Sequence, residues 1–236
     1  MNVIPVHAVA AWLNAAAMTT GRQMFLFMMS VFATCGKLHA AAGLPHRGKI
    51  PTFVPEKADA MRKITNQELH RPSVDEFAAM KKMPVAVVLD NVRSLQNVGS
   101  FFRTCDAFAV ESLSLCGITA TPPNRDIHKT ALGAELSVAW RYWPTTAECI
   151  DSLHRDGWTV VAVEQVEGAV MLGGFVPQPD RKYALVFGNE VDGVDQRAVD
   201  MCDMAVEIPQ AGTKHSLNVS VSGGVVLWHL FSTLMR

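Results

Sequence analysis

The 236-residue sequence has few cysteines and none of the common metal-binding motifs. Its five cysteines are odd in number and widely spaced, with no C-x-x-C pair, so neither a disulfide framework nor a zinc cluster is expected. Its eight histidines form no H-E-x-x-H motif, and no residue pair has the spacing of metal ligands. We therefore predict a protein without metal, located in the reducing cytoplasm.

Strong net charge and long apolar runs are absent as well. The formal net charge is −1 and the pI is about 6.7, which excludes a uniformly basic nucleic-acid coat protein and an acidic tail protein. The apolar stretch at 23–36 is shorter than the roughly 20 residues that a membrane-spanning helix needs. With 49% hydrophobic residues, the chain is able to bury a sizeable core as one domain, or as one domain with an appendage.

Residues 1–60 differ in character from the remainder of the chain. Arg22, the apolar stretch after it and the small residues that follow imitate a signal peptide, which would make the protein exported or membrane-tethered. The alternative, which we favour, is an over-extended start outside the fold, because Met61 opens a polar, charged stretch with a helical pattern. We then expect a helical arm at 61–83 and a domain at 84–236 that does not associate with a membrane.

From residue 84 onward, short apolar runs alternate with helical patterns, which is typical of βαβ units and a parallel sheet. The run VAVVLD at 85–90 is rich in β-branched residues, as a strand buried on both faces requires. We predict one open, mostly parallel α/β sheet with helices on both faces. The expected strands are 85–90, 112–118, 136–143, 158–164, 183–188 and 204–209. The expected helices are one that begins at 97, then 145–155, 195–201 and 217–235, with a short helix at most in 127–135.

The last of these helices, Leu217 to Met235, is apolar on nearly every side. A helix of this kind must be covered on more than one face. We expect the sheet to cover one face and a second copy of the chain to cover another. The apolar residues are Val219, Val221, Val225, Val226, Leu227, Trp228, Leu230 and Phe231.

The common nucleotide and hydrolase motifs are missing from this α/β pattern. No G-x-G-x-x-G is present, so a Rossmann dinucleotide or methyltransferase site is unsupported. GNEVDGVD at 188–195 has a G-x-x-x-x-G spacing but lacks the Lys and Ser/Thr of a phosphate loop, and no G-x-S-x-G elbow exists. Because ligands of open α/β sheets bind beyond the carboxyl ends of the strands, polar segments that follow strands are the remaining candidates.

The first such segment is 91–108, which follows the strand at 85–90. Asn97 is placed to cap the predicted helix, and Gly99 allows another backbone to approach closely. Arg103 lies six residues after Asn97 on the same helix. Taken alone, Arg103 is equally well explained as a solvated or salt-bridged surface residue.

Two further segments, 185–195 and 207–224, also follow predicted strands. In 185–195, glycines lie on both sides of Glu190. Taken alone, this segment fits an ordinary turn that leads into a helix capped by Asp195. In 207–224, a glycine turn precedes the final helix. Taken alone, this segment fits simple capping of that helix by Ser216.

Together and in this order, the three segments resemble the motifs of the SpoU (TrmH-like) family of RNA ribose 2′-O-methyltransferases, in the SPOUT superfamily. Those motifs read approximately N-x-G-x-x-x-R, then G-x-E-x-x-G after an apolar residue, then I-P-x-x-G followed by S-L-N-V-S. The resemblance covers about residues 85–231. The matching residues are Asn97, Gly99, Arg103, Phe187, Gly188, Glu190, Gly193, Ile208, Pro209, Gly212, Ser216, Leu217, Asn218, Val219 and Ser220.

The resemblance implies S-adenosylmethionine as cofactor, a trefoil knot in the C-terminal segment, and a homodimer with the site near its interface. It implies methylation of a ribose 2′-hydroxyl in tRNA or rRNA, without identifying the RNA. The cofactor-binding residues that it implies are Phe187, Gly188, Ile208, Pro209 and Leu217. The implied catalytic residue is Arg103, with Asn97, Glu190, Ser216 and Asn218 shaping and supporting the site.

Arginine is a poor base, because its pKa normally lies above 12. Its planar fork is instead suited to hold an RNA phosphate and to orient the hydroxyl, and we leave the protonation role of Arg103 open. The residues expected to bind RNA are Arg93, Arg125, Lys129 and Lys214, for which scattered surface charge is the alternative. A non-catalytic dimer that binds RNA or S-adenosylmethionine is the alternative function, against which the intact motif residues argue.

Overall fold

The computed structural model describes residues 62–235. The expectations for residues 1–60, both the extension outside the fold and the imitation of a signal peptide, lie outside the described residues. Within 62–235, no helix is both long and apolar enough to cross a membrane.

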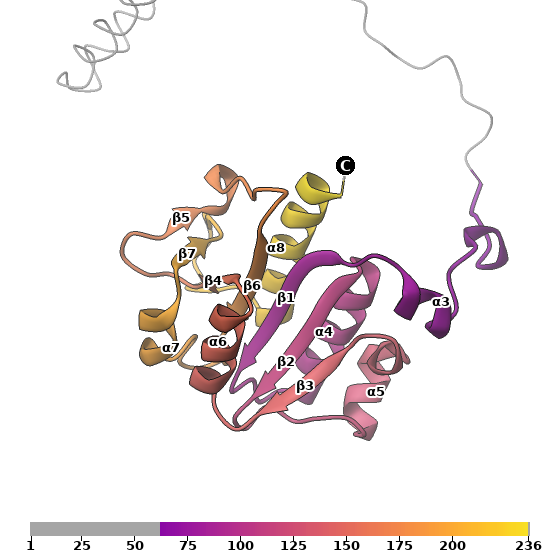
Figure 1. Ribbon diagram of the computed structural model, residues 1–236, viewed down its shortest axis with the longest axis horizontal. Coiled ribbons are helices and arrows are strands. Elements are labelled where there is room, and N and C mark those ends of the chain that lie inside the picture. The colour runs from indigo at the N-terminus through magenta and orange to yellow at the C-terminus, as the bar shows by residue number, and fades with distance from the viewer. Residues whose placement is uncertain (1–61, 236) are drawn as a thin grey trace, which may run out of the picture. The chain divides into compact units, whose positions relative to one another are not determined.

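One seven-stranded sheet forms the centre of the molecule, with the strand order β3-β2-β1-β6-β4-β7-β5 (Figure 1). All six pairs of neighbouring strands are parallel, which confirms the predicted fold class. The strands are β1 (Met83–Asp90), β2 (Val110–Cys116), β3 (Trp140–Trp143), β4 (Trp158–Val163), β5 (Val170–Met171), β6 (Lys182–Phe187) and β7 (Met204–Glu207).

Helices cover both faces of this sheet (Figure 1). One face carries α4 (Leu95–Ala107), α5 (Arg125–Ala131) and α8 (Val219–Leu234), and the other carries α6 (Thr146–Arg155) and α7 (Gln196–Met201). The short helix α3 (Val74–Ala79) precedes the sheet, and one-turn 3₁₀ helices lie at η1 (Gln67–Leu69), η2 (Ala134–Leu136) and η3 (Leu172–Gly174).

Alternating side chains of the strands supply the two layers of the core. Along β1, Val85, Val87 and Leu89 pack into the layer of α4 and α8, whereas Ala86 and Val88 pack into the layer of α6. All five are fully buried. This two-sided burial explains why the strand is a continuous apolar run rather than an alternating one.

Several predicted boundaries are wrong by a few residues. Helix α4 begins at Leu95, with Ser94 as its N-cap, so Asn97 lies inside the first turn and does not cap the helix. Helix α8 begins at Val219 and is capped by Asn218, not by Ser216. In both cases the cap is another short polar residue, whose side-chain oxygen accepts a backbone N–H of the first turn.

Three further segments differ from the sequence-based expectation. Strand β3 is limited to Trp140–Trp143, because Leu136 belongs to η2 and residues 137–139 connect η2 to the strand. Strand β5 was not predicted, because its two exposed residues are too few to show the alternating apolar pattern of a strand. In the expected arm, only α3 and η1 are helical, and the capping box of Ser73 and Glu76 fixes the start of α3.

The parallel arrangement places the carboxyl ends of all strands at one edge of the sheet. Since β4 lies between β6 and β7, the loops that follow these three strands are neighbours at that edge. The trefoil knot that the resemblance implies stays a prediction.

Candidate functional site

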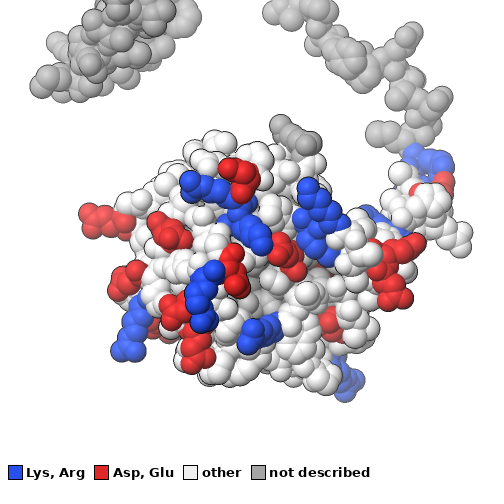
Figure 2. All heavy atoms as spheres, in the orientation of Figure 1, with Lys and Arg blue, Asp and Glu red and all other residues white. Residues whose placement is uncertain are grey.

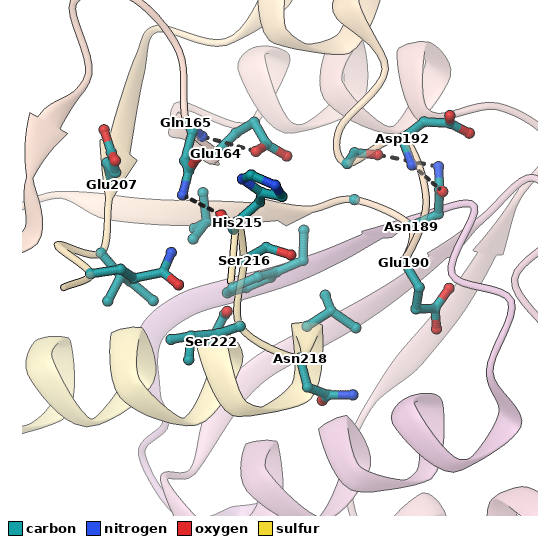
Figure 3. A pocket seen from close by; sticks show the side chains of 18 of the residues that line it. Glu164, Gln165, Asn189, Glu190, Asp192, Glu207, His215, Ser216, Asn218 and Ser222 are labelled. Atoms are coloured by element: carbon teal, nitrogen blue, oxygen red, sulfur yellow. Dashed lines mark hydrogen bonds between the residues drawn. The ribbon is translucent and has the colours of Figure 1, made fainter. Parts of the chain in front are cut away.

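A cavity of about 540 Å³ lies beyond the carboxyl ends of β4, β6 and β7 (Figure 3). This volume is in the range of small-molecule sites, which measure about 300–1,000 Å³. Three loops and the first turns of α8 line the cavity. The lining residues are Val163, Glu164, Gln165, Phe187, Gly188, Asn189, Glu190, Val191, Asp192, Gly193, Val206, Glu207, Ile208, Gln210, His215, Ser216, Leu217, Asn218, Val219 and Ser222.

The loop after β6 is folded tightly on itself. Asn189 and Gly193 exchange two backbone hydrogen bonds of 3.0 and 3.1 Å, and the Asn189 side chain accepts the N–H groups of Val191 and Asp192 at 2.9 Å. A Cβ atom at Gly188 would lie 1.9 Å from the carbonyl carbon of Gly193. Glycine at 188 is therefore required by the loop's own backbone.

Hydrogen bonds between side chains join the three motifs of the sequence. The Nδ2 of Asn97 donates to Oε1 of Glu190 at 2.7 Å, and the Nδ2 of Asn218 donates to Oδ1 of Asn97 at 3.2 Å. Glu190 also accepts the backbone N–H groups of Arg93 and Ser94, both at 3.1 Å. One residue of each motif is thus held in a single network at the mouth of the cavity.

This network determines the charge state of Glu190. Partial burial raises the pKa of Glu190, but hydrogen bonds from the Asn97 side chain and from backbone N–H groups outweigh it and leave the pKa below its ordinary value. Glu190 is therefore a carboxylate at neutral pH, and both of its oxygens already accept hydrogen bonds.

A buried carboxylate supports the same edge of the sheet. Asp90 ends β1 and is only 1% exposed. Its side chain accepts the backbone N–H of Asp195 at 2.9 Å and the Nδ2 of Asn91 at 2.8 Å, and it also accepts the hydroxyl of Thr146. Asp90 thus fixes the end of the loop that carries Glu190.

Four of the five predicted cofactor-binding residues line the cavity, and Pro209 is the exception among the described residues. Of the predicted supporting residues, Glu190, Ser216 and Asn218 line the cavity, while Asn97 reaches it through its two hydrogen bonds. The structure therefore brings most of the predicted residues together. Their roles stay predictions.

Arg103, the predicted catalytic residue, lies apart from the cavity. It is exposed on α4, about 9 Å along the helix axis from Asn97, and does not line the cavity. Among the interactions within residues 62–235, its guanidinium has neither a hydrogen bond nor an ion pair. Arg103 is therefore available to a group from outside the chain.

Two of the residues expected to bind RNA lie beside acidic side chains. Arg93 lies 3.9 Å from Asp192, and Lys129 pairs with Asp126 at 2.6 Å. On the face shown in Figure 2, basic and acidic side chains are interleaved. Arg125 and Lys214 are exposed, the former at the start of α5 and the latter in the loop after β7.

Two residues that follow β4, Glu164 and Gln165, belong to the site but were not predicted from the sequence. Oε2 of Glu164 accepts the N–H of Val194 at 3.0 Å. Nε2 of Gln165 donates to the carbonyl of His215 at 3.0 Å (Figure 3). The available signal was a pair of polar residues directly after a buried strand. Among the described residues, no group of three His, Cys, Asp or Glu side chains is arranged to hold a metal ion.

Comparison with known proteins adds to this geometry. The family model described as SpoU rRNA Methylase family matches residues 84–228. The 23S rRNA (guanosine-2′-O-)-methyltransferase RlmB of Vibrio parahaemolyticus is 29% identical over 167 residues, which span 69% of this chain and 64% of that protein. The tRNA (guanosine(18)-2′-O)-methyltransferase of Thermus thermophilus is 30% identical over 161 residues, which span 68% and 81%.

Solved structures share the fold. The SpoU methyltransferase AviRb from Streptomyces viridochromogenes, in complex with AdoMet, matches with a TM-score of 0.59 and 23% identity, over 67% of this chain and 63% of that one. The AdoMet-bound rRNA methyltransferase from Sinorhizobium meliloti matches with a TM-score of 0.61 and 24% identity, over 68% and 61%.

Proposed function

Because the chain belongs to the SpoU rRNA Methylase family, we propose that it transfers a methyl group from S-adenosylmethionine to a ribose 2′-hydroxyl of tRNA or rRNA. The observation that carries this proposal is the network of Asn97, Glu190 and Asn218, which joins the three motifs beside a cavity of suitable size. Relatives with RNA (guanosine-2′-O-)-methyltransferase names support the same reaction.

The charge of the cavity supports the choice of cofactor. Four carboxylate side chains line it, whereas no lysine or arginine of the described residues does. A negative site attracts the sulfonium and ammonium groups of S-adenosylmethionine and repels the phosphates of NAD or ATP. The carboxylates belong to Glu164, Glu190, Asp192 and Glu207.

The residues that would hold the cofactor are Phe187, Gly188, Ile208 and Leu217, with Pro209 shaping the start of the last loop. When bound, S-adenosylmethionine supplies an electrophilic methyl group on a sulfonium. The protein's task is then to align the hydroxyl for in-line attack and to weaken its bond to the proton.

We assign that task to Arg103. Its guanidinium, free of partners within residues 62–235, is able to hold a phosphate of the RNA with one edge and to orient the 2′-hydroxyl with another. Asn97, Glu190, Ser216 and Asn218 shape the surface on which the ribose rests. Arg93, Arg125, Lys129 and Lys214 bind the flanking RNA backbone.

We also propose that the protein is a homodimer through α8. This helix buries Val226, Leu227 and Leu230 against the sheet, yet leaves Trp228 57% exposed and Val221 51% exposed. An apolar face of this kind is suited to a matching face on a second copy. In this dimer, residues of the second chain complete the site around the exposed Arg103.

The domain boundaries and the location of the protein are part of the same proposal. The family match begins at residue 84, which supports a methyltransferase domain at 84–236 preceded by a short arm at 61–83 and an extension at 1–60. The cytoplasm is the proposed compartment, because tRNA and rRNA are present there.

Mass spectrometry of RNA from cells with and without the protein tests the reaction. We expect one 2′-O-methylated nucleotide in tRNA or rRNA to disappear when the protein is missing and to return when it is supplied. Purified protein with bulk tRNA or rRNA and S-adenosylmethionine should restore the same methyl group. Binding of RNA without any methyl transfer would favour the non-catalytic alternative.

A further inference from the structure

The loop after β7, residues 209–217, is the most weakly held wall of the cavity. Gln210, His215, Ser216 and Leu217 from this loop line the cavity. Within residues 62–235, the loop makes a single hydrogen bond, in which the carbonyl of His215 accepts from Nε2 of Gln165 at 3.0 Å (Figure 3). The Gln165 amide is therefore the one hydrogen-bond partner that the described residues give this loop.

Gln165 is itself attached to a well-fixed part of the backbone. Its N–H donates to Oε1 of Glu164 at 2.9 Å. Glu164 in turn donates its N–H to the carbonyl of Val206 at 3.2 Å and accepts the N–H of Val194 at 3.0 Å. The end of β4 is thus bonded to strand β7 and to the loop after β6, and the Gln165 amide extends from there to the loop after β7.

We propose that Gln165 is a positioning residue for the cofactor, because it holds the loop 209–217 in the form that completes the cavity. This inference rests on the proposed function, since it names S-adenosylmethionine as the ligand. Ordering of a loop before binding lowers the entropy cost that the ligand must overcome. Gln165 should therefore affect cofactor affinity more than the rate of methyl transfer.

Gln165→Glu tests the hydrogen bond with little change of size. The carboxylate is unable to donate and faces the carbonyl of His215, so the bond is lost. We expect the Kd for S-adenosylmethionine, measured by calorimetry, to rise about three- to tenfold, in line with one lost hydrogen bond. The KM for the cofactor should rise similarly, while kcat at saturating cofactor should stay within about twofold of the wild type.

Two variants complete the comparison. Gln165→Met removes the donor without adding a charge to the cavity and should raise the Kd as Gln165→Glu does. Gln178→Glu makes the same chemical change on an exposed residue outside the cavity and should bind like the wild type. A Gln165→Glu protein that binds the cofactor as tightly as the wild type would overturn the inference.

Trypsin provides a readout that needs no cofactor. It cleaves after Lys214, at the peptide bond next to the carbonyl that Gln165 holds. We expect trypsin to cleave the full-length protein after Lys214 several-fold faster in Gln165→Glu than in the wild type or in Gln178→Glu. Mass spectrometry of the fragments measures this cleavage. Equal rates would overturn the inference even if the wild type binds the cofactor. Failure of the wild type to bind S-adenosylmethionine would instead refute the proposed function, and the cleavage rates would still decide whether Gln165 holds the loop.

Discussion

Asn97 and Glu190 are separated by 93 positions in the sequence, yet the Asn97 amide donates to the Glu190 carboxylate at 2.7 Å. Their contact crosses from the helix after β1 to the loop after β6, and these two strands are neighbours in the sheet. The same amide accepts from Asn218, so its donor and acceptor sides connect two different loops. Asn97 therefore contributes to the site by connecting its parts.

Removal of this connection should destabilise the protein. Asn97→Ala leaves Glu190 without its side-chain donor and Asn218 without its acceptor, and we expect a loss of about 1–3 kcal/mol in the free energy of unfolding. Urea denaturation measures this loss. Asn66→Ala is the control, because the Asn66 side chain makes no capping hydrogen bond, and its midpoint should hardly move. Equal midpoints for the two variants would contradict the structural role of Asn97.

Glu190 should also make the stability of the protein depend on pH. Its pKa is lowered in the folded protein, so the folded state binds the proton less readily than the unfolded state. The stabilisation is therefore complete above the ordinary carboxyl pKa of about 4.3 and is lost as the pH falls through the lower value of the folded protein.

Glu190→Gln should remove this share of the acid sensitivity. Urea midpoints measured from pH 6 down to pH 3 should fall less steeply for Glu190→Gln than for the wild type. Glu167→Gln, on an exposed loop residue, is the control and should follow the wild-type curve. Parallel curves for wild type and Glu190→Gln would show that the hydrogen bonds to Glu190 do not stabilise its charged form.

The family motifs pointed to residues that the structure brings together, but not to the residues that hold them in place. The resemblance implied that Glu190 and Asn218 support the same site as Asn97, and hydrogen bonds join the three residues in the structure. The contacts of Glu164 were not expected, since they depend on β4 lying between β6 and β7. The order of strands follows from long-range packing, which no local pattern in the sequence reports.

Helix caps show why some boundaries were wrong. Ser94 and Asn97 are both residues that favour the N-cap position, and the sequence alone does not rank two such residues three apart. In the structure, Ser94 caps α4 and Asn97 is thereby free to bind Glu190 and Asn218. The long-range hydrogen bonds decide which of the two residues takes the cap.

A methyl group at residue 188 should disrupt the loop after β6. The Cβ of Gly188→Ala would lie 1.9 Å from the carbonyl carbon of Gly193. Because one atom is part of the backbone and the other is bonded to it, no side-chain rotation relieves this clash. We expect a loss of about 1–3 kcal/mol or more in stability, together with loss of S-adenosylmethionine binding. Gly173→Ala, outside the cavity, is the control, because nothing lies within 4 Å of the added Cβ. Thermal unfolding and calorimetry of both variants measure these effects, and an undisturbed Gly188→Ala protein would contradict this loop structure.

Trp228 should matter more to the dimer than to the fold. Its side chain is 57% exposed, with ring contacts to Phe108 and Phe231 at centroid distances of 6.1 and 6.2 Å. Trp228→Ala should therefore cost the isolated chain little but raise the dimer dissociation constant at least tenfold. Leu230→Ala, at a fully buried position, should instead lower stability by about 2–5 kcal/mol. Sedimentation of the wild type as a monomer at micromolar concentration would refute the proposed dimer.

Arg103 should be essential for methyl transfer and dispensable for folding. Its side chain is exposed and has no partner within residues 62–235, while the buried face of α4 is formed by other residues. Arg103→Ala should leave the unfolding midpoint and the affinity for S-adenosylmethionine nearly unchanged, but lower methyl transfer by orders of magnitude. Arg155→Ala, on α6 at the opposite face of the sheet, is the control and should transfer methyl groups normally.

The sharper comparison is Arg103→Lys, which retains the positive charge but loses the planar fork that holds phosphate and hydroxyl together. We expect the lysine variant to be nearly as inactive as the alanine variant. Recovery of most of the rate by lysine would mean that Arg103 attracts RNA only through its charge, and the catalytic role assigned to it would then be wrong.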